Sequence, residues 1–171
     1  MPDTQIVLLR GINLGRAKRV AMADLRAMLE SLGYENVRTL RNSGNVVLSG
    51  APVDAARIEV ALAEQLGVAS RVIALTAAEL ASVVQDHPLL DQADLQIAFL
   101  FDPADRAQLE PLLEQNWAPE ALALGARVAY LWCPNGQSQS ALTKAVSDVL
   151  ADRVTTRTWA TVLRLHALAT A

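Results

Sequence analysis

This chain of 171 residues has very little cysteine, histidine or aromatic content. Cys133 is its only cysteine, so a disulfide within the chain is excluded. The two histidines, His87 and His166, lie far from Cys133 and from each other, whereas metal sites usually draw on ligands at short, regular spacings. We therefore predict no metal site.

Long apolar runs are also missing. No segment approaches the roughly 20 consecutive apolar residues that cross a bilayer as a helix. The segment from Met1 to Gln5 has neither the basic nor the apolar region of a signal peptide. We expect a protein that does not enter the membrane, and we place it in the cytoplasm by default.

Three common functional motifs are absent as well. The chain has no G-x-x-x-x-G-K-[ST] phosphate loop, no G-x-G-x-x-G fingerprint and no G-x-S-x-G nucleophile elbow, since residues 136–140 lack the second glycine. The familiar templates for nucleotide-binding enzymes and serine hydrolases therefore do not apply. We predict no cofactor, and the sequence leaves open whether the protein is an enzyme.

Positive charge is scarce outside the N-terminal region. The formal net charge is −3, but residues 1–50 hold seven Lys and Arg against four Asp and Glu, whereas residues 71–120 hold two against nine. An acidic chain with few aromatic residues disfavours nucleic-acid binding, which usually needs a basic face and rings on which bases stack. The N-terminal excess either attracts a phosphate or carboxylate or only keeps the surface soluble.

The N-terminal half predicts the order strand, helix, strand, strand, helix, strand. Apolar spacing, caps and turn residues predict strands at 5–9, 36–40, 45–49 and 71–75, and helices at 21–32 and 54–66. Gly33 and Gly67 are placed to end the two helices, and Asn42-Ser43-Gly44 to turn the hairpin.

The C-terminal half repeats this order. A helix opened by the capping box Thr76-Ala77-Ala78-Glu79 connects the two halves. The further elements are predicted strands at 96–101, 118–124, 128–132 and 153–157, a helix from the cap Asp102 to 114, a helix from Ser138 or Ser140 to 150, and a closing helix at 159–168.

These patterns predict an α+β fold made of a tandem pair of ferredoxin-like β-α-β-β-α-β units with antiparallel sheets and a closing C-terminal helix. The first unit spans residues 1–76, a connecting helix and loop span 77–94, and the second unit with the closing helix spans 95–171. No Gly/Ser-rich linker separates the units, so we expect them to pack as one compact body.

A basic, glycine-containing loop, residues 10–19, follows the first predicted strand. Because the expected strand order is 4-1-3-2, this loop and the hairpin turn should meet at one end of the sheet and offer N–H groups beside positive charge to an anion. The predicted ligand-binding residues are Arg10, Gly11, Asn13, Gly15, Lys18, Ser43, Gly44 and Asn45. In the alternative interpretation, the glycines only permit turns and the asparagines only tie down their own loops.

A second polar cluster is predicted in the C-terminal half, formed by Ser138, Ser140, Lys144 and Arg157. The serines precede a helix, whose N-terminus can bind an anion, and Arg157 lies near the end of a strand. Alternatively, the serines are only helix caps and Lys144 is only solvated.

Four ordered segments carry a family resemblance. Residues 10–15 (RGINLG), 42–47 (NSGNVV), 140–143 (SALT) and 155–162 (TTRTWATV) resemble the signature of a bacterial family known as domain of unknown function 1697. The resemblance implies a bacterial, cytoplasmic α+β protein and no particular activity. In that family the last segment more often has asparagine where this chain has Thr158 and Ala160, which implies a difference in any ligand contact made there.

Three functions from different classes remain at this point. The first is binding of a small phosphate- or carboxylate-bearing ligand by the Arg/Gly/Asn loop. The second is assembly, with a homodimer formed through sheet edges or faces. The third is an enzyme acting on a phosphorylated or acyl substrate, in which Arg10, Asn13 and Arg157 stabilise negative charge.

Overall fold

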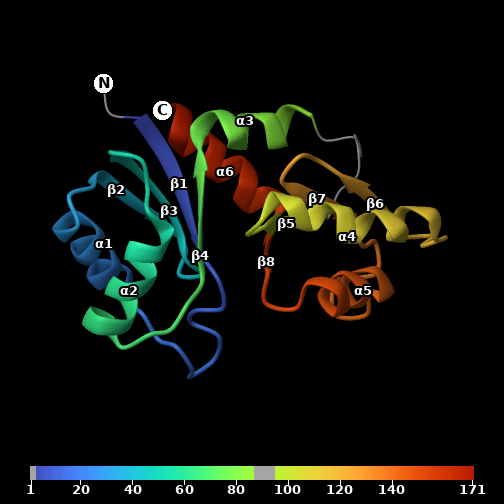
Figure 1. The fold of residues 1–171 in the computed structure, drawn as a ribbon, viewed down its shortest axis with the longest axis horizontal. Helices are drawn as coiled ribbons and strands as arrows, with labels where there is room; N and C mark the ends of the chain where they lie inside the picture. Colours follow the sequence, from blue (N-terminus) through green and yellow to red (C-terminus); the bar gives the residue numbers. More distant parts are fainter. Residues whose placement is uncertain (1–2, 87–94) are drawn as a thin grey trace. The chain divides into compact units, whose positions relative to one another are not determined.

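The computed structural model describes residues 3–86 and 95–171, and divides the chain into two units (Figure 1). The first unit comprises residues 1–81 and 164–171, and the second comprises residues 82–163. Each unit contains a four-stranded antiparallel sheet with helices, so the chain is an α+β protein. Within the described part of the chain, every helix is too short or too polar to span a bilayer.

The first sheet has the strand order β2-β3-β1-β4, which matches the predicted order 4-1-3-2. Every neighbouring pair is antiparallel. The elements of this part are β1 (Asp3–Leu9), α1 (Met22–Ser31), β2 (Glu35–Leu40), β3 (Asn45–Gly50), α2 (Ala55–Leu66) and β4 (Val72–Thr76).

Helices α1 and α2 cover one face of this sheet (Figure 1). Alternate residues of β1 and β3, among them Val7 and Leu48, pack with Leu29 of α1 and Leu62 of α2 in one buried core. This alternation is expected because successive side chains of a strand point to opposite faces. The core fixes where the loops at the end of the sheet emerge.

The predicted helix ends of this unit are confirmed. The Asp54 carboxylate accepts the Arg57 N–H at the start of α2, and Gly67 ends that helix in the left-handed conformation. Helix α3 (Ala77–Gln85) opens with the reciprocal capping box, in which Glu79 Oε2 accepts the Thr76 N–H and Thr76 Oγ1 accepts the Glu79 N–H.

The second sheet has the order β6-β7-β5-β8, again with antiparallel neighbours. Its strands are β5 (Leu95–Leu100), β6 (Ala121–Leu124), β7 (Val128–Trp132) and β8 (Val154–Thr158). The helical elements of this half are η1 (Pro103–Asp105), α4 (Arg106–Leu109), η2 (Glu110–Glu114), α5 (Ala141–Leu150) and α6 (Trp159–Thr170).

Two predicted elements of this half differ from the structure, both at a proline. The single helix expected up to Glu114 is a short α-helical turn between two 3-10 segments, because Pro111 has no N–H to donate and its ring disturbs the preceding turn. The strand expected from residue 118 begins only at Ala121, after Pro119, which cannot donate to the ladder.

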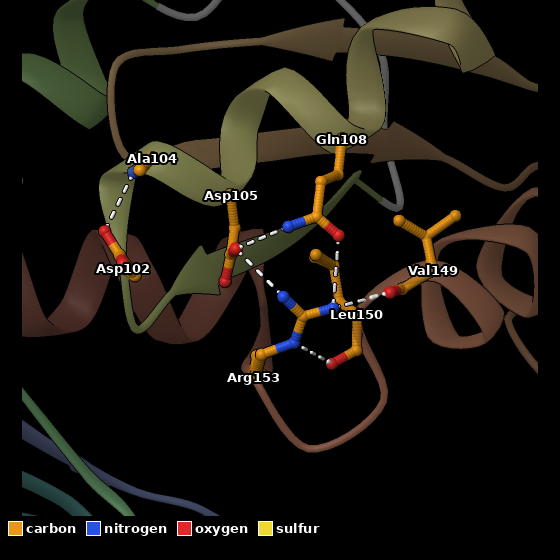
Figure 2. A network of polar contacts seen from close by, with 7 residues as sticks. All are labelled: Asp102, Ala104, Asp105, Gln108, Val149, Leu150 and Arg153. Atoms are coloured by element: carbon orange, nitrogen blue, oxygen red, sulfur yellow. Dashed lines mark hydrogen bonds and ion pairs between the residues drawn. The ribbon is translucent and has the colours of Figure 1, made fainter.

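An arginine ties α4 to the end of α5 (Figure 2). Arg153 Nη1 lies 2.9 Å from Oδ1 of the buried Asp105, and Nη2 donates to Gln108 Oε1 over 3.2 Å. The same guanidinium donates to the carbonyls of Val149 and Leu150 at the C-terminus of α5, where positive charge is favourable. This network holds the chain as it enters β8.

The division of the chain into two units falls within helices α3 and α6. Helix α3 and helix α6 each contribute residues to both units, so the boundaries at 76 and 95 stay a prediction, as does the packing of the units as one body. Residues 87–94 of the expected connecting segment, including His87, lie outside the described residues.

Gly44 provides a test of the hairpin geometry. Its φ is +91°, and a Cβ added there would lie 2.7 Å from Leu9 Cβ. We expect Gly44→Ala to lower the free energy of unfolding by about 2–4 kcal/mol, through left-handed strain and overpacking. Gly15→Ala is the matched control, since Gly15 also has a positive φ but no atom within 4 Å. Urea denaturation of both variants decides: equal losses would contradict the steric argument.

Candidate functional site

Asn13 joins the basic loop to the hairpin turn. Its Nδ2 donates to the carbonyl of Asn42 over 2.6 Å and to that of Val20 over 2.9 Å, and its Oδ1 accepts the Val20 N–H over 2.8 Å. The Asn13 N–H also donates to the Lys18 carbonyl, which closes a small hairpin. The predicted meeting of the two segments is therefore confirmed, and Asn13 ties down its own loop.

The hairpin turn is held from its other side by Gly44 and Asn45. The Gly44 carbonyl accepts the Leu9 N–H over 2.9 Å. Asn45 is fully buried, and its Nδ2 donates to the Leu40 carbonyl and to Ser43 Oγ. These bonds give Asn45 a structural role, and its contact with a ligand stays a prediction.

The other predicted residues of the first cluster lie around this junction. Arg10 is half-buried, and its backbone is bound to the start of β4 through the Arg71 carbonyl and the Ser70 hydroxyl. Gly11, Gly15 and Lys18 all have positive φ, and Gly15 and Lys18 are exposed. The structure thus brings the eight predicted residues to one end of the first sheet without testing whether they bind anything.

A hollow of about 510 Å³ opens beside this junction, within the first unit. Asn13, Asn42 and Arg19 line it from the loop and the turn, and residues 20–22 and Asp24 line it from the start of α1. Arg19 is exposed, and its Nη1 donates to the Gly15 carbonyl over 3.0 Å. The hollow therefore combines one cation, one acid and the N-terminus of a helix.

The N-terminus of α1 has no side-chain cap. Ala21 occupies the N-cap position. Its carbonyl accepts the Leu25 N–H, but its methyl side chain cannot accept a hydrogen bond, so the N–H groups of residues 22–24 have no partner within the helix or from a cap side chain. Arg19, Ala21 and Asp24 were not among the predicted binding residues. The predicted helix start at residue 21, directly after the basic loop, was the signal that could have identified them.

The second predicted cluster contains a carboxylate that the sequence did not indicate. Ser140 is the N-cap of α5, as one interpretation predicted, and its Oγ accepts the Thr143 N–H over 2.9 Å. The Ser140 hydroxyl donates to Glu120 Oε2, and Glu120 Oε1 accepts the Leu142 N–H over 3.2 Å. Glu120 therefore occupies the anion-binding position at this helix N-terminus.

Cys133 lies next to this cap. Its thiol is buried and lies 3.4 Å from Ser140 Oγ and 3.6 Å from Thr143 Oγ1. Burial raises the pKa of Cys133, while the hydrogen bonds with Ser140 and Thr143 act in the opposite direction. A thiol that is protonated and buried is a poor nucleophile.

Arg157 does not join Ser140. It pairs with Ile97 across the β5–β8 ladder, whereas the neighbouring residue Ala98 belongs to the core beneath α5. Its guanidinium is buried and donates to Thr155 Oγ1 over 2.7 Å and to the Thr156 carbonyl. Burial lowers the pKa of Arg157 to about 10. Arg157 and the α5 cap thus lie on opposite faces of the sheet.

Ser138 and Lys144 are both exposed, and Lys144 pairs with Asp148 one turn further along α5. Thr158, which stands where the family more often has asparagine, also has a structural role, since its Oγ1 accepts the Thr161 N–H at the start of α6. Threonine and asparagine both serve as N-caps.

Among residues 3–86 and 95–171, no three His, Cys, Asp or Glu side chains gather in a way that could hold a metal ion.

Comparison with known proteins identifies a family and a fold. Residues 3–130 match the profile of a family described as protein of unknown function, DUF1697, so the segments at 140–143 and 155–162 lie beyond the match. The structure is similar to that of the conserved bacterial protein SP0830 from Streptococcus pneumoniae, with a TM-score of 0.80, 23% identity and 99% of each chain covered. No curated protein matches the chain in sequence.

Glu120→Ala tests the internal carboxylate at α5. We expect the variant to lose about 1–3 kcal/mol of unfolding free energy, because the Ser140 hydroxyl and the Leu142 N–H lose a charged acceptor. Added sulfate should stabilise this variant more than the wild type, since the vacated helix N-terminus can then hold an anion. Glu114→Ala, at an exposed position, is the control. Equal losses in the two variants would contradict this role.

Proposed function

We propose that this chain, which belongs to the DUF1697 family of proteins of unknown function, binds a small phosphate- or carboxylate-bearing ligand in the hollow beside Asn13. The observation that carries the proposal is the uncapped N-terminus of α1 together with the guanidinium of Arg19, bonded to the Gly15 carbonyl, in one hollow. N–H groups and a guanidinium are the donors that hold oxyanions in proteins.

The order of the loop supports this proposal. The three side-chain bonds of Asn13 hold the loop against the Asn42 carbonyl before any ligand arrives, so Arg19 and the start of α1 already lie beside each other. Binding then requires little additional ordering, which favours affinity. Arg10, Lys18 and Ser43, from the same end of the sheet, are proposed to add charge and hydrogen bonds around the hollow.

Asp24 restricts the class of ligand. Its carboxylate lines the same hollow and lies in the first turn of α1, where it competes for the free N–H groups. A nearby negative charge weakens the binding of highly charged anions by repulsion. We therefore propose a singly charged ligand group, such as a carboxylate or a phosphate diester, rather than a polyphosphate.

A second candidate function is self-assembly through β6. This strand lies at the edge of the second sheet, and its residues, Ala121 to Leu124, are all apolar and half-exposed. An edge strand without charge leaves backbone groups open to pairing with another strand. Two copies joined at β6 would form one continuous sheet.

The repeated strand order supports a finer interpretation of the fold. Both sheets follow the order of a ferredoxin-like unit, and we propose that the chain is a tandem duplication of that unit. A cytoplasmic location is part of the same proposal.

Anion binding is tested by thermal denaturation and amide NMR with acetate, dimethyl phosphate and inorganic pyrophosphate at constant ionic strength. We expect acetate or dimethyl phosphate to stabilise the wild type and to shift the amide signals of residues 19–24. Arg19→Gln and Arg10→Ala should weaken both effects, and Arg16→Gln, an exposed change in the same loop, should not. Equal responses of Arg19→Gln and Arg16→Gln, or a stronger response to pyrophosphate, would contradict the proposal.

Assembly is tested by sedimentation velocity over a range of protein concentrations. The wild type should show a sedimentation coefficient that rises with concentration, and Ala123→Lys in β6 should abolish the rise, because a charged edge resists strand pairing. Ala56→Lys, at an exposed position of α2, should leave it unchanged. A wild type that stays monomeric at every concentration would rule out this candidate.

A further inference from the structure

A second hollow lies in the first unit, away from the basic loop. It has a volume of about 520 Å³, and Thr4, Asn36, Arg38 and Ser49 contribute to its lining together with Glu30. Thr4 and Ser49 face each other across the β1–β3 ladder, four residues along β3 from Asn45. The hollow therefore lies toward the opposite end of the sheet from the Asn13 junction.

The hollow lies beside β2, the edge strand of the first sheet, and is lined from both faces. Glu30 comes from α1, whereas Thr4, Arg38 and Ser49 lie on the face that α1 and α2 do not cover. Val46 and Leu48 belong to the core beneath these helices, whereas Val47, the partner of Arg38 in the ladder, does not. Since side chains alternate along a strand, Arg38 and Ser49 share the face of Val47. Polar residues thus gather on a face where Val47 and Ile6 are fully buried.

An irregularity in β2 sets the position of Arg38. The pairing between β2 and β3 shifts register between Glu35 and Arg38, and Asn36 has a φ of +52°. Asn36 Nδ2 donates to Ser49 Oγ over 2.8 Å, and the Ser49 hydroxyl donates in turn to the Glu35 carbonyl over 3.3 Å. Bulges redirect side chains and are common beside binding sites. This one is held by a short chain of hydrogen bonds.

The Arg38 guanidinium carries an unused donor. Its Nε is buried and has no hydrogen-bond partner within the described part of the chain, although the residue as a whole is half-buried. A buried donor without an acceptor is costly, so natural proteins rarely leave one unpaired without a reason. An oxyanion that binds in the hollow can reach the guanidinium of Arg38, and a small shift of the side chain then brings Nε to the missing acceptor.

We propose that this second hollow binds a small zwitterion that carries a carboxylate and an amino group, as an amino acid or a peptide end does. Arg38 provides the planar donor pair that matches a carboxylate. Glu30 provides a negative charge for the amino group, and the Thr4 hydroxyl and the Asn36 amide oxygen offer further hydrogen bonds. Glu30 disfavours doubly charged phosphate by repulsion.

The test is NMR titration of the whole chain with glycine, acetate and inorganic phosphate at constant ionic strength. We expect glycine to shift the Arg38 Nε–H signal and the amide signals of Asn36 and Ser49 at lower concentrations than acetate, and phosphate to act most weakly. Arg38→Gln should weaken glycine binding at least about tenfold, because bonds to a charged group are lost. Arg57→Gln removes the same charge from an exposed position of α2 and should have no effect.

Two further variants complete the test. Glu30→Gln should remove the preference for glycine over acetate and leave acetate binding in place. Arg19→Gln should leave glycine binding unchanged, which separates this hollow from the site beside Asn13. Shifts that map away from residues 36–38 and 49, equal binding by Arg38→Gln and the wild type, or a stronger response to phosphate would each overturn the proposal. The Arg38 Nε–H signal of the wild type provides a readout that does not depend on any variant.

Discussion

The close approach of Gly44 to Leu9 is the constraint on which the polar end of the first unit depends. Only a residue without Cβ fits there, since an added Cβ would lie 2.7 Å from the Leu9 side chain. Once the turn lies against β1, the Asn42 carbonyl comes within reach of Asn13, and Asn13 then orders the loop up to Val20. The position of Arg19 beside α1 is thus a consequence of packing at a buried glycine.

The N-termini of α5 and α1 differ in whether side chains of the chain itself cap them. At α5, Ser140 and Glu120 provide acceptors, so the helix is complete without a ligand. At α1, the side chain of Ala21 provides no acceptor, and the start of the helix lines an open hollow. Both helices have the same macrodipole, and at both N-termini the first N–H groups lack a partner within the helix. The difference between a stabilising contact and a candidate site therefore lies in whether the chain provides its own carboxylate.

Much of the fold could be predicted from local signals. Apolar alternation located the strands, and Asp54, Gly67 and the Thr76–Glu79 box marked helix ends, because these signals act between residues close in sequence. Contacts between distant residues could not be predicted, and Glu120, 20 residues before Ser140, is one of them. The grouping of Arg157 with Ser140 was wrong for another reason. Arg157 lies near the end of β8 as predicted, but the two-residue period of the strand places its side chain on the face opposite α5. The bulge that positions Arg38 has no reliable sequence signal.

Asn13 has a consequence for the kinetics of any ligand that enters the hollow beside it. Backbone groups of the same chain satisfy its amide on both sides, so the loop is already ordered before a ligand enters. Association with a rigid, open surface is limited by diffusion and orientation, and differences in affinity then appear in the dissociation rate. A ligand of the proposed site would therefore bind without waiting for the loop to order, and its affinity would set how long it stays bound.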